Sequence, residues 1–147
     1  MNQFNLRVYG ILINELNEVL ISDEYEFGTF FTKFPGGGVE YGEGISDALK
    51  REFKEELNAE IVSSQLLYFN EYFQESVFHK NVQVTCFYYH VKCKNIEHLG
   101  KVNYKIPLTV RGEKQRWVKL SELKENDLSF QTDQWALQYL RKNIISS

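Results

Sequence analysis

The segment Ile45–Leu57 places acidic residues on the side that its apolar residues predict to be buried. With residues spaced about 100° apart around a helix axis, the apolar residues form one stripe: Ile45, Ala48, Leu49, Phe53 and Leu57. With Ile45 set at 0°, Glu52 and Glu56 fall inside the stripe, at about 340° and about 20°, and Glu55 lies at its edge. Because an unpaired buried carboxylate costs several kcal/mol of folding free energy, we expect a positive group beside them.

A divalent cation is one group that meets this requirement. Residues at i, i+3 and i+4 project together, so Glu52, Glu55 and Glu56 can offer carboxylate oxygens to one side of the helix. Mg²⁺ and Mn²⁺ prefer oxygen ligands, and Mg²⁺ usually shares them with water and substrate phosphates. The alternatives are a lysine or arginine from elsewhere in the chain, or a simple solvated acidic face.

A glycine-rich loop over residues 35–44 leads directly into this predicted helix and holds five of the nine glycines in the chain. Glycines allow a backbone to approach a ligand closely, and a helix N-terminus is a favourable place for phosphate oxygens. Lys33, just before the loop, is a candidate contact for a substrate phosphate; its alternative is an ordinary surface lysine. A flexible turn is the alternative reading of the loop.

The rest of the chain indicates a mixed α+β domain over residues 1–147. We expect the helix to end at Asn58, which tolerates the left-handed conformation. Apolar runs at 6–13 and 19–21 around polar Asn14–Asn17 predict a β-hairpin. Further strands are predicted at 29–34, 61–73, 82–91 and 117–120. A last helix is expected at about 133–144, burying some of four residues: Trp135, Leu137, Leu140 and Ile144.

Composition and charge exclude several classes of protein. A net charge of −3 argues against a broad basic surface for a nucleic-acid polymer. No apolar run approaches the ~20 residues that a membrane helix needs, and the N-terminus lacks the apolar core of a signal peptide. Cys86 and Cys93 are seven residues apart on a predicted strand, so their side chains should point to opposite faces. Reduced thiols in a cytoplasmic protein fit this pattern.

The loop and helix together resemble the Nudix box, Gx5Ex7REUxEExGU, in which U is a bulky aliphatic residue. In this chain the motif runs from Gly37 through Glu43 and continues from Arg51 to Ala59. Every charged position is present. Phe53 replaces an aliphatic residue, Asn58 stands where glycine is usual, and Ala59 is small. The resemblance implies a Nudix-type α/β/α sandwich around a mixed β-sheet.

The resemblance also implies an activity: metal-assisted attack of water on a nucleoside diphosphate linked to another moiety. Glu52, Glu55 and Glu56 match the family's metal ligands for Mg²⁺ or Mn²⁺, and the Gly36 carbonyl adds a ligand in some members. Glu43 and Arg51 match a pair that ties the loop to the helix. The general base is either Glu52 or a residue outside the box, for which Glu113 is the first candidate; Glu75 and Glu97 are weaker ones.

Residues beyond the box leave the substrate open among nucleoside triphosphates, nucleotide sugars and dinucleotides. Arg7 and Tyr9 on the first predicted strand are candidates for stacking a base or contacting phosphate. Two other readings use the same fold: a sensor that binds a nucleotide without cleaving it, and an enzyme similar to isopentenyl-diphosphate isomerase, in which a cysteine takes part. The expected partner is a small nucleotide rather than a membrane, and homodimers are common among proteins that this chain resembles.

Overall fold

A computed structural model describes residues 1–101 and 108–145 of the chain. The elements follow in the order β1 (Gln3–Leu12), β2 (Glu18–Glu26), β3 (Thr29–Lys33), β4 (Gly36–Gly38), α1 (Ile45–Leu57), β5 (Glu60–Phe69), β6 (Val82–Lys94), β7 (Gly112–Lys119) and α2 (Gln131–Leu140). A short 3-10 turn covers Glu125–Asp127, and a π-helical turn over Arg141–Ile145 follows α2 directly.

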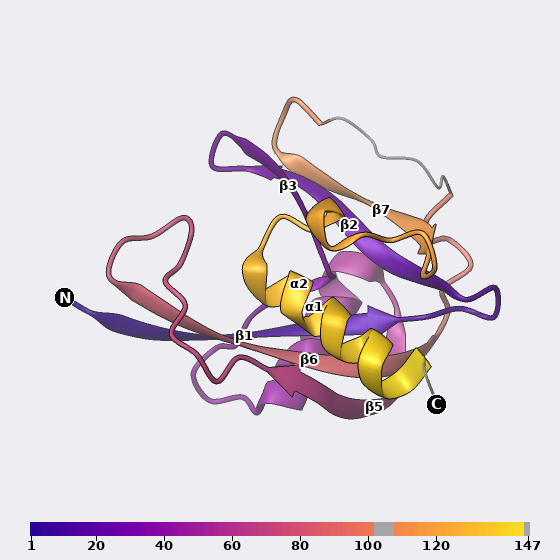
Figure 1. The fold of residues 1–147 in the computed structure, drawn as a ribbon, viewed down its shortest axis with the longest axis horizontal. Helices are drawn as coiled ribbons and strands as arrows, with labels where there is room; N and C mark the ends of the chain where they lie inside the picture. The colour runs from indigo at the N-terminus through magenta and orange to yellow at the C-terminus, as the bar shows by residue number, and fades with distance from the viewer. Residues whose placement is uncertain (102–107, 146–147) are drawn as a thin grey trace.

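The strands form two sheets, and the two helices lie on opposite sides of them (Figure 1). The larger sheet has the order β4-β1-β6-β5, in which β1 and β6 are parallel and the other neighbours antiparallel. The smaller sheet, β3-β2-β7, is antiparallel throughout. This is the α/β/α arrangement around a mixed sheet that the sequence predicts.

Strand β1 lies inside the larger sheet and supplies both halves of the core. Its side chains alternate between the two faces, as in any strand. Val8 and Leu12 pack with the buried face of α1, whereas Tyr9 and Ile11 pack in the cluster that includes α2. Burial on both faces explains why the second half of β1, residues 8–12, has no charged side chain.

Helix α1 has the bounds that the sequence predicts. Asn58 follows it with φ of 49° and ψ of 40°, the left-handed conformation expected there, and its N–H donates to the Lys54 carbonyl. The predicted apolar residues from Ala48 to Leu57 are buried, and so is Glu52. Glu56, by contrast, is exposed. A helical projection predicts the direction of a side chain, but the neighbouring elements decide whether it is covered.

The predicted hairpin between the first two strands is wrong beyond its turn. Asn17 has a φ of 58°, and one bridge joins Ile13 to Val19. From there the strands separate into different sheets, because β4 and β6 pair with the two edges of β1 and β3 and β7 pair with those of β2. Alternation in the sequence identifies strands, but it does not identify their partners.

Strand β5 ends at Phe69 instead of continuing to residue 73. The buried side chain of Asn70 takes over the backbone pairing there: its amide donates to the carbonyls of Tyr72 and Val84 and accepts from the Cys86 N–H. A polar side chain thus satisfies backbone groups that a longer strand would pair.

The other predicted elements are present with shifted ends. β6 continues three residues further than predicted, and β7 begins five residues earlier, at Gly112. Helix α2 begins at Gln131 and buries Leu137 and Leu140, while Trp135 is only partly buried. The side chain of Ile144 lies outside the described residues.

The positions of the two cysteines agree with the sequence expectation. Cys86 belongs to the core cluster with α2 and Cys93 packs against the cluster with α1, so the two thiols do lie on opposite faces. No helix in the described ranges is long and apolar enough to span a membrane.

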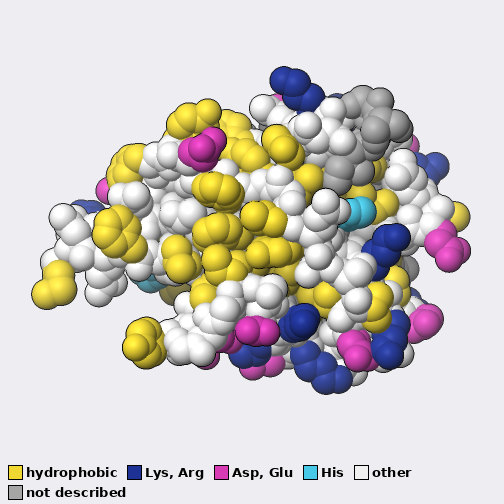
Figure 2. All heavy atoms as spheres, turned by 90° about the horizontal axis from the view of Figure 1, so that it is seen from below, with side chains coloured by type: hydrophobic (Ala, Val, Ile, Leu, Met, Phe, Trp, Pro, Cys, Tyr) yellow, Lys and Arg dark blue, Asp and Glu magenta, His cyan; other side chains and the backbone are white. Residues whose placement is uncertain are grey.

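Hydrophobic side chains gather on the face shown in Figure 2. The edge strand β5 exposes three apolar side chains, those of Val62, Leu66 and Phe69.

Gly10 and Phe53 should be coupled in stability. A Cβ at Gly10 of β1 would lie 2.4 Å from the ring of Phe53, a fully buried side chain of α1. We expect Gly10→Ala to destabilise the protein by about 1–3 kcal/mol through overpacking. In a Phe53→Leu background the added methyl group has room, so the cost of Gly10→Ala should fall.

Urea unfolding of the wild type, both single variants and the double variant measures this coupling. We expect an interaction free energy of about 1 kcal/mol in favour of the double variant. Additive single-variant effects would contradict the close packing of the Phe53 ring on Gly10.

Candidate functional site

Arg51 on α1 holds the glycine-rich loop against the helix. Its Nε and Nη2 donate to the two carboxylate oxygens of Glu43, at 3.0 and 2.8 Å, and Nη2 also donates to the Gly38 carbonyl at 2.9 Å. Nη1 lies 3.2 Å from Glu52 Oε1 and 3.3 Å from Glu55 Oε2. These hydrogen bonds lower the pKa of Glu43, with Arg51 as the main cause. The loop and the helix therefore meet at one guanidinium group.

The loop backbone leaves room for the carboxylate of Glu52. A Cβ on Gly37 would lie 2.6 Å from Glu52 Oε1 and 2.9 Å from Oε2, closer than any real side chain allows. At Gly36, φ is 146° and a Cβ would lie 2.1 Å from the Val8 carbonyl oxygen. Glycine at these two positions thus lets the loop approach both the Glu52 carboxylate and β1.

Glu113 lies close to the box carboxylates although 57 residues separate it from Glu56 in the sequence. It is directly opposite Glu24 in the pairing of β2 with β7. Although Glu56 is exposed as a residue, its carboxyl group is partly desolvated, and this desolvation, followed by the charge of Glu113, raises its pKa to about 8. Desolvation and the charge of Glu24 likewise raise the pKa of Glu113. The structure therefore brings the predicted outside glutamate to the carboxylates of α1.

Lys33 is buried, in contrast to the surface lysine considered as its alternative. Its ammonium group donates to the carbonyls of Phe34 and Gly36, at 3.2 and 3.1 Å, and lies 3.1 Å from Glu24 Oε2. Burial works against this charge, but the combined attraction of Glu24, Tyr9 and Glu56 outweighs it, so the pKa of Lys33 is raised. The Gly36 carbonyl, predicted as a ligand of a metal ion, thus faces a cation of the chain itself.

Negative charge exceeds positive charge around this point. Glu40 also lies 4.0 Å from Arg51, and the charge of Glu52 acts on Arg7. In the described part of the chain, the residues joined by these interactions include more than twice as many carboxylates as cations: Glu24, Glu40, Glu43, Glu52, Glu55, Glu56 and Glu113 against Arg7, Lys33 and Arg51. Within residues 1–101 and 108–145, however, no three acidic, His or Cys side chains are grouped closely enough to hold a metal ion as they stand.

The donor groups nevertheless fit a hard cation. All of them are carboxylate or carbonyl oxygens, the ligand type that Mg²⁺ and Mn²⁺ prefer. Glu24 Oε2 is buried and, among the described residues, accepts no hydrogen bond beyond its ion pair with Lys33. Two of the predicted ligands, Glu52 and Glu55, contact Arg51 instead. Arg51 contacts one oxygen of each carboxylate, Glu52 Oε1 and Glu55 Oε2, which leaves the second oxygen of each for a cation.

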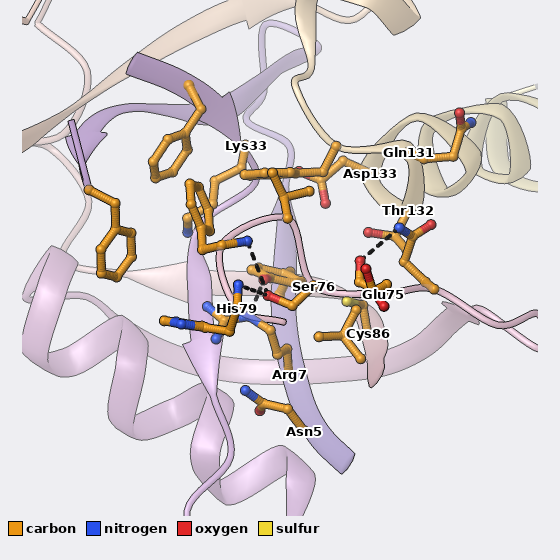
Figure 3. A pocket seen from close by; sticks show the side chains of 18 of the residues that line it. Asn5, Arg7, Lys33, Glu75, Ser76, His79, Cys86, Gln131, Thr132 and Asp133 are labelled. Carbon is orange, nitrogen blue, oxygen red and sulfur yellow. Dashed lines mark hydrogen bonds between the residues drawn. The ribbon is translucent and has the colours of Figure 1, made fainter. Parts of the chain in front are cut away.

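A pocket of about 260 Å³ adjoins Lys33 and Glu24 (Figure 3). Arg7 and Tyr9 of β1 line it together with Lys33, so three predicted substrate contacts share one cavity. Arg7 Nε donates to the Tyr9 hydroxyl at 2.6 Å. Its two terminal nitrogens have no hydrogen-bond or ion-pair partner in the ranges that the structure describes. Arg7 can therefore still bind an anion at the end of the pocket nearest Gly38.

Aromatic side chains form another wall of this pocket. The rings of Phe31, Phe78 and Phe130 all contact one another: the Phe31 centroid is 5.3 Å from each of the other two, which are 5.9 Å apart. Phe27 contacts Phe78 at 5.0 Å. Glu75, one of the weaker general-base candidates, also lines the pocket, whereas Glu97 does not. The pocket thus combines ring faces with an arginine and a lysine.

The sequence analysis missed Glu24, Thr132 and Asp133, which all line the pocket. Asp133 is 1% exposed, and burial raises its pKa to about 6. The available signal for Glu24 was an acidic pair, Asp23 and Glu24, shortly after the apolar run of residues 19–21. Asp133 lies in the first turn of a helix, where a carboxylate is ordinary. The sequence therefore gives no sign of its hydrogen bonds to Phe34 and Tyr88.

Comparisons with known proteins support the arrangement described above. The family model for the NUDIX domain matches residues 3–139. No curated protein sequence matches the chain.

Solved structures resemble the fold over nearly the whole chain. The MutT protein from Methanosarcina mazei Go1 has a TM-score of 0.71 at 18% identity, with 97% of each chain covered. The MutT NUDIX hydrolase from Burkholderia pseudomallei has a TM-score of 0.70 at 17% identity, covering 95% of this chain and 99% of that one. A structure described as an ADP compounds hydrolase has a TM-score of 0.66 at 15% identity, covering 97% and 74%. At these identities the likeness concerns the fold.

The raised pKa of Glu56 predicts a pH-dependent stability in the presence of a chelator. The pKa in the folded protein, about 8, exceeds the ordinary value of 4.5, so the folded state holds this proton more tightly than the unfolded state. The resulting stabilisation is complete below pH 4.5 and is lost as the pH rises through 8. We therefore expect the free energy of unfolding to fall between pH 4.5 and about 8, relative to Glu56→Gln, which does not titrate.

Urea unfolding at several pH values in EDTA measures this difference, with Glu15→Gln in the exposed β1–β2 turn as the matched control. If the wild type and Glu56→Gln keep a constant difference over this range, the carboxylates of Glu56 and Glu113 do not crowd each other.

Proposed function

Since the chain belongs to the Nudix family, we propose that it is a pyrophosphohydrolase that uses Mg²⁺ or Mn²⁺ to cleave a nucleoside diphosphate linked to another moiety. The observation that carries the proposal is the excess of carboxylates packed against the glycine loop, beside a pocket that holds Arg7. Negative charge in this amount suits a cation and the phosphate groups that the cation accompanies.

Glu52, Glu55 and Glu56, with the Gly36 carbonyl, are the residues that would hold the cation. When bound, a divalent cation polarises the phosphoryl oxygens and lowers the pKa of a coordinated water. The residues of the chain orient this chemistry. Arg51 keeps the Glu52 carboxylate facing Gly37, and Glu43 keeps Arg51 in place.

Glu113 is our proposed general base, with Glu52 as the alternative. Desolvation and the charge of Glu24 raise the pKa of Glu113, which makes its carboxylate a stronger proton acceptor than an ordinary surface glutamate. Glu52 Oε1 lies 3.2 Å from Arg51 Nη1, so this oxygen already accepts a hydrogen bond from the chain itself.

The substrate would lie across the pocket and the carboxylates. Arg7 presents two unpaired guanidinium nitrogens, which can bind phosphate oxygens as a fork. The rings around Phe31 offer faces on which a nucleobase can stack. Lys33 lies between the two regions and would meet a phosphate only by leaving Glu24. Nucleoside triphosphates, nucleotide sugars and dinucleotides all contain the required groups.

A nucleotide sensor without hydrolytic activity is the second candidate. It is favoured by one observation: Arg51 and Lys33 already neutralise part of the acidic charge, in contacts with Glu52, Glu55 and Glu24. Isomerase chemistry that depends on a cysteine has weaker support, because burial raises the pKa of Cys86 to about 11 and that of Cys93 to about 12.

We also propose the setting in which this activity takes place. Residues 1–147 form one domain, since the pocket draws on β1 as well as the start of α2. The two free thiols suit a reducing compartment such as the cytoplasm. The expected partner is a small nucleotide. Homodimers are common among proteins that this chain resembles, and the exposed side chains of β5 offer apolar surface for one; light scattering measures the mass in solution.

Glu52→Gln and Glu56→Gln should each lower kcat by about two orders of magnitude or more, because each removes a negative oxygen ligand while keeping the shape of the side chain. The measurement is phosphate release from a panel of nucleoside triphosphates, nucleotide sugars and dinucleotides, with Mg²⁺, with Mn²⁺ and with EDTA. Glu60→Gln, on exposed β5, is the control and should retain wild-type turnover.

Circular dichroism and thermal unfolding establish that the variants remain folded. Near-wild-type turnover in both Glu52→Gln and Glu56→Gln would defeat the ligand assignment. If tight nucleotide binding occurs without hydrolysis across the whole panel, the sensor replaces the hydrolase.

A further inference from the structure

The connection between β3 and β4 carries both Lys33 and Gly36, and it is held from outside by the approach to α2. The Thr32 N–H donates to the Ser129 hydroxyl at 2.8 Å, and the Ser129 N–H donates back to the Thr32 carbonyl at 2.9 Å. The Phe34 N–H donates to Asp133 Oδ2 at 3.1 Å. Groups more than 90 residues away in the sequence thus fix this short segment.

Asp133 is the buried end of this connection. Its other carboxylate oxygen accepts the hydroxyl of Tyr88, which also contacts Thr132 Oγ1 at 3.0 Å. Asp133 is 1% exposed, and Phe34 and Tyr88 are fully buried. Because Phe34 is fully buried, removal of the Asp133 carboxylate would leave the Phe34 N–H without its hydrogen-bond acceptor.

Lys33 and Gly36, which flank Phe34 and Pro35, belong to the two halves of the candidate site. Lys33 lines the pocket and contacts Glu24, and its ammonium group donates to the Gly36 carbonyl. Gly36 pairs with Tyr9 of β1, next to Gly37 and the Glu52 carboxylate. Pro35 cannot donate a hydrogen bond, and its carbonyl accepts from the Gly10 N–H at 2.9 Å. Phe34 consequently supplies the N–H by which α2 can hold the segment from Lys33 to Gly36.

We propose that Asp133 is a positioning residue: by accepting the Phe34 N–H, it sets the place of the Gly36 carbonyl and of the Lys33 ammonium group. This role rests on the proposed function for its consequence in hydrolysis, but not for its structural content. Asp133 and Lys33 both line the pocket, together with Thr132 from the same turn of α2 (Figure 3). Asp133 needs no direct contact with the substrate to affect turnover.

Three variants separate this role from general support of the core. Asp133→Ala removes the acceptor. Asp133→Asn keeps a carbonyl oxygen that can still accept the Phe34 N–H, and it is the conservative variant expected to rescue the contact. Tyr88→Phe removes the other hydrogen bond to Asp133 while it leaves the Phe34 contact intact.

The first readout is structural and needs neither a metal ion nor a substrate. In Asp133→Ala we expect the Phe34 amide proton to exchange with solvent at least tenfold faster. We also expect the ¹³C signal of the Gly36 carbonyl to shift. Asp133→Asn and Tyr88→Phe should stay near the wild-type values. An unchanged Gly36 carbonyl in Asp133→Ala would overturn the proposal. If Asp133→Ala does not fold, loss of the Phe34 contact in Asp133→Asn with an unmoved Gly36 carbonyl would overturn it equally.

The second readout uses Mn²⁺ alone, followed by electron paramagnetic resonance. We expect Asp133→Ala to weaken Mn²⁺ binding at least fivefold, and Asp133→Asn and Tyr88→Phe to weaken it less than twofold. With a hydrolysed substrate in hand, kcat should fall in Asp133→Ala by more than KM changes. Wild-type Mn²⁺ affinity in Asp133→Ala would refute the link to the site. Absence of hydrolysis in the wild type would refute the proposed function and leave the structural readout valid.

Discussion

The guanidinium group of Arg51 is the contact on which the candidate site depends. It joins two oxygens of Glu43 and the Gly38 carbonyl in the loop to Glu52 on the helix. Because Arg51 is itself part of α1, these bonds set the distance between the loop backbone and the carboxylates. Loss of one partner would leave the other charge partly buried and unpaired, which is far more costly than loss of an exposed pair.

Electrostatics determines what this junction can do. Arg51 and Lys33 compensate part of the acidic charge. Desolvation, and after it repulsion from neighbouring carboxylates, raises the pKa of both Glu56 and Glu113. An additional cation would relieve this repulsion. Arg7 of β1 lines the adjoining pocket, and its two terminal guanidinium nitrogens can bind an anion there. A site that favours a cation beside a site that favours an anion is suited to a metal-bound phosphate.

Local interactions account for what could be predicted from the sequence. Helix α1 was predicted with its observed bounds because its apolar spacing and the left-handed residue Asn58 act within a few residues of each other. The hairpin was predicted wrongly since strand partners come from distant segments: β1 pairs with β6, not with β2. Asp133 was missed for the same reason, as its bond to Phe34 spans 99 residues.

The amino-acid sequence by itself determined that a glycine loop and an acidic helix adjoin, and with them the family to which the chain belongs. It determined this because the spacing of charges along a helix follows from its geometry alone. Only the tertiary structure decided which cations and which further carboxylates surround that helix. Lys33, Glu24 and Glu113 come from three different strands, β3, β2 and β7, and burial and charge act through space, whatever the separation along the chain.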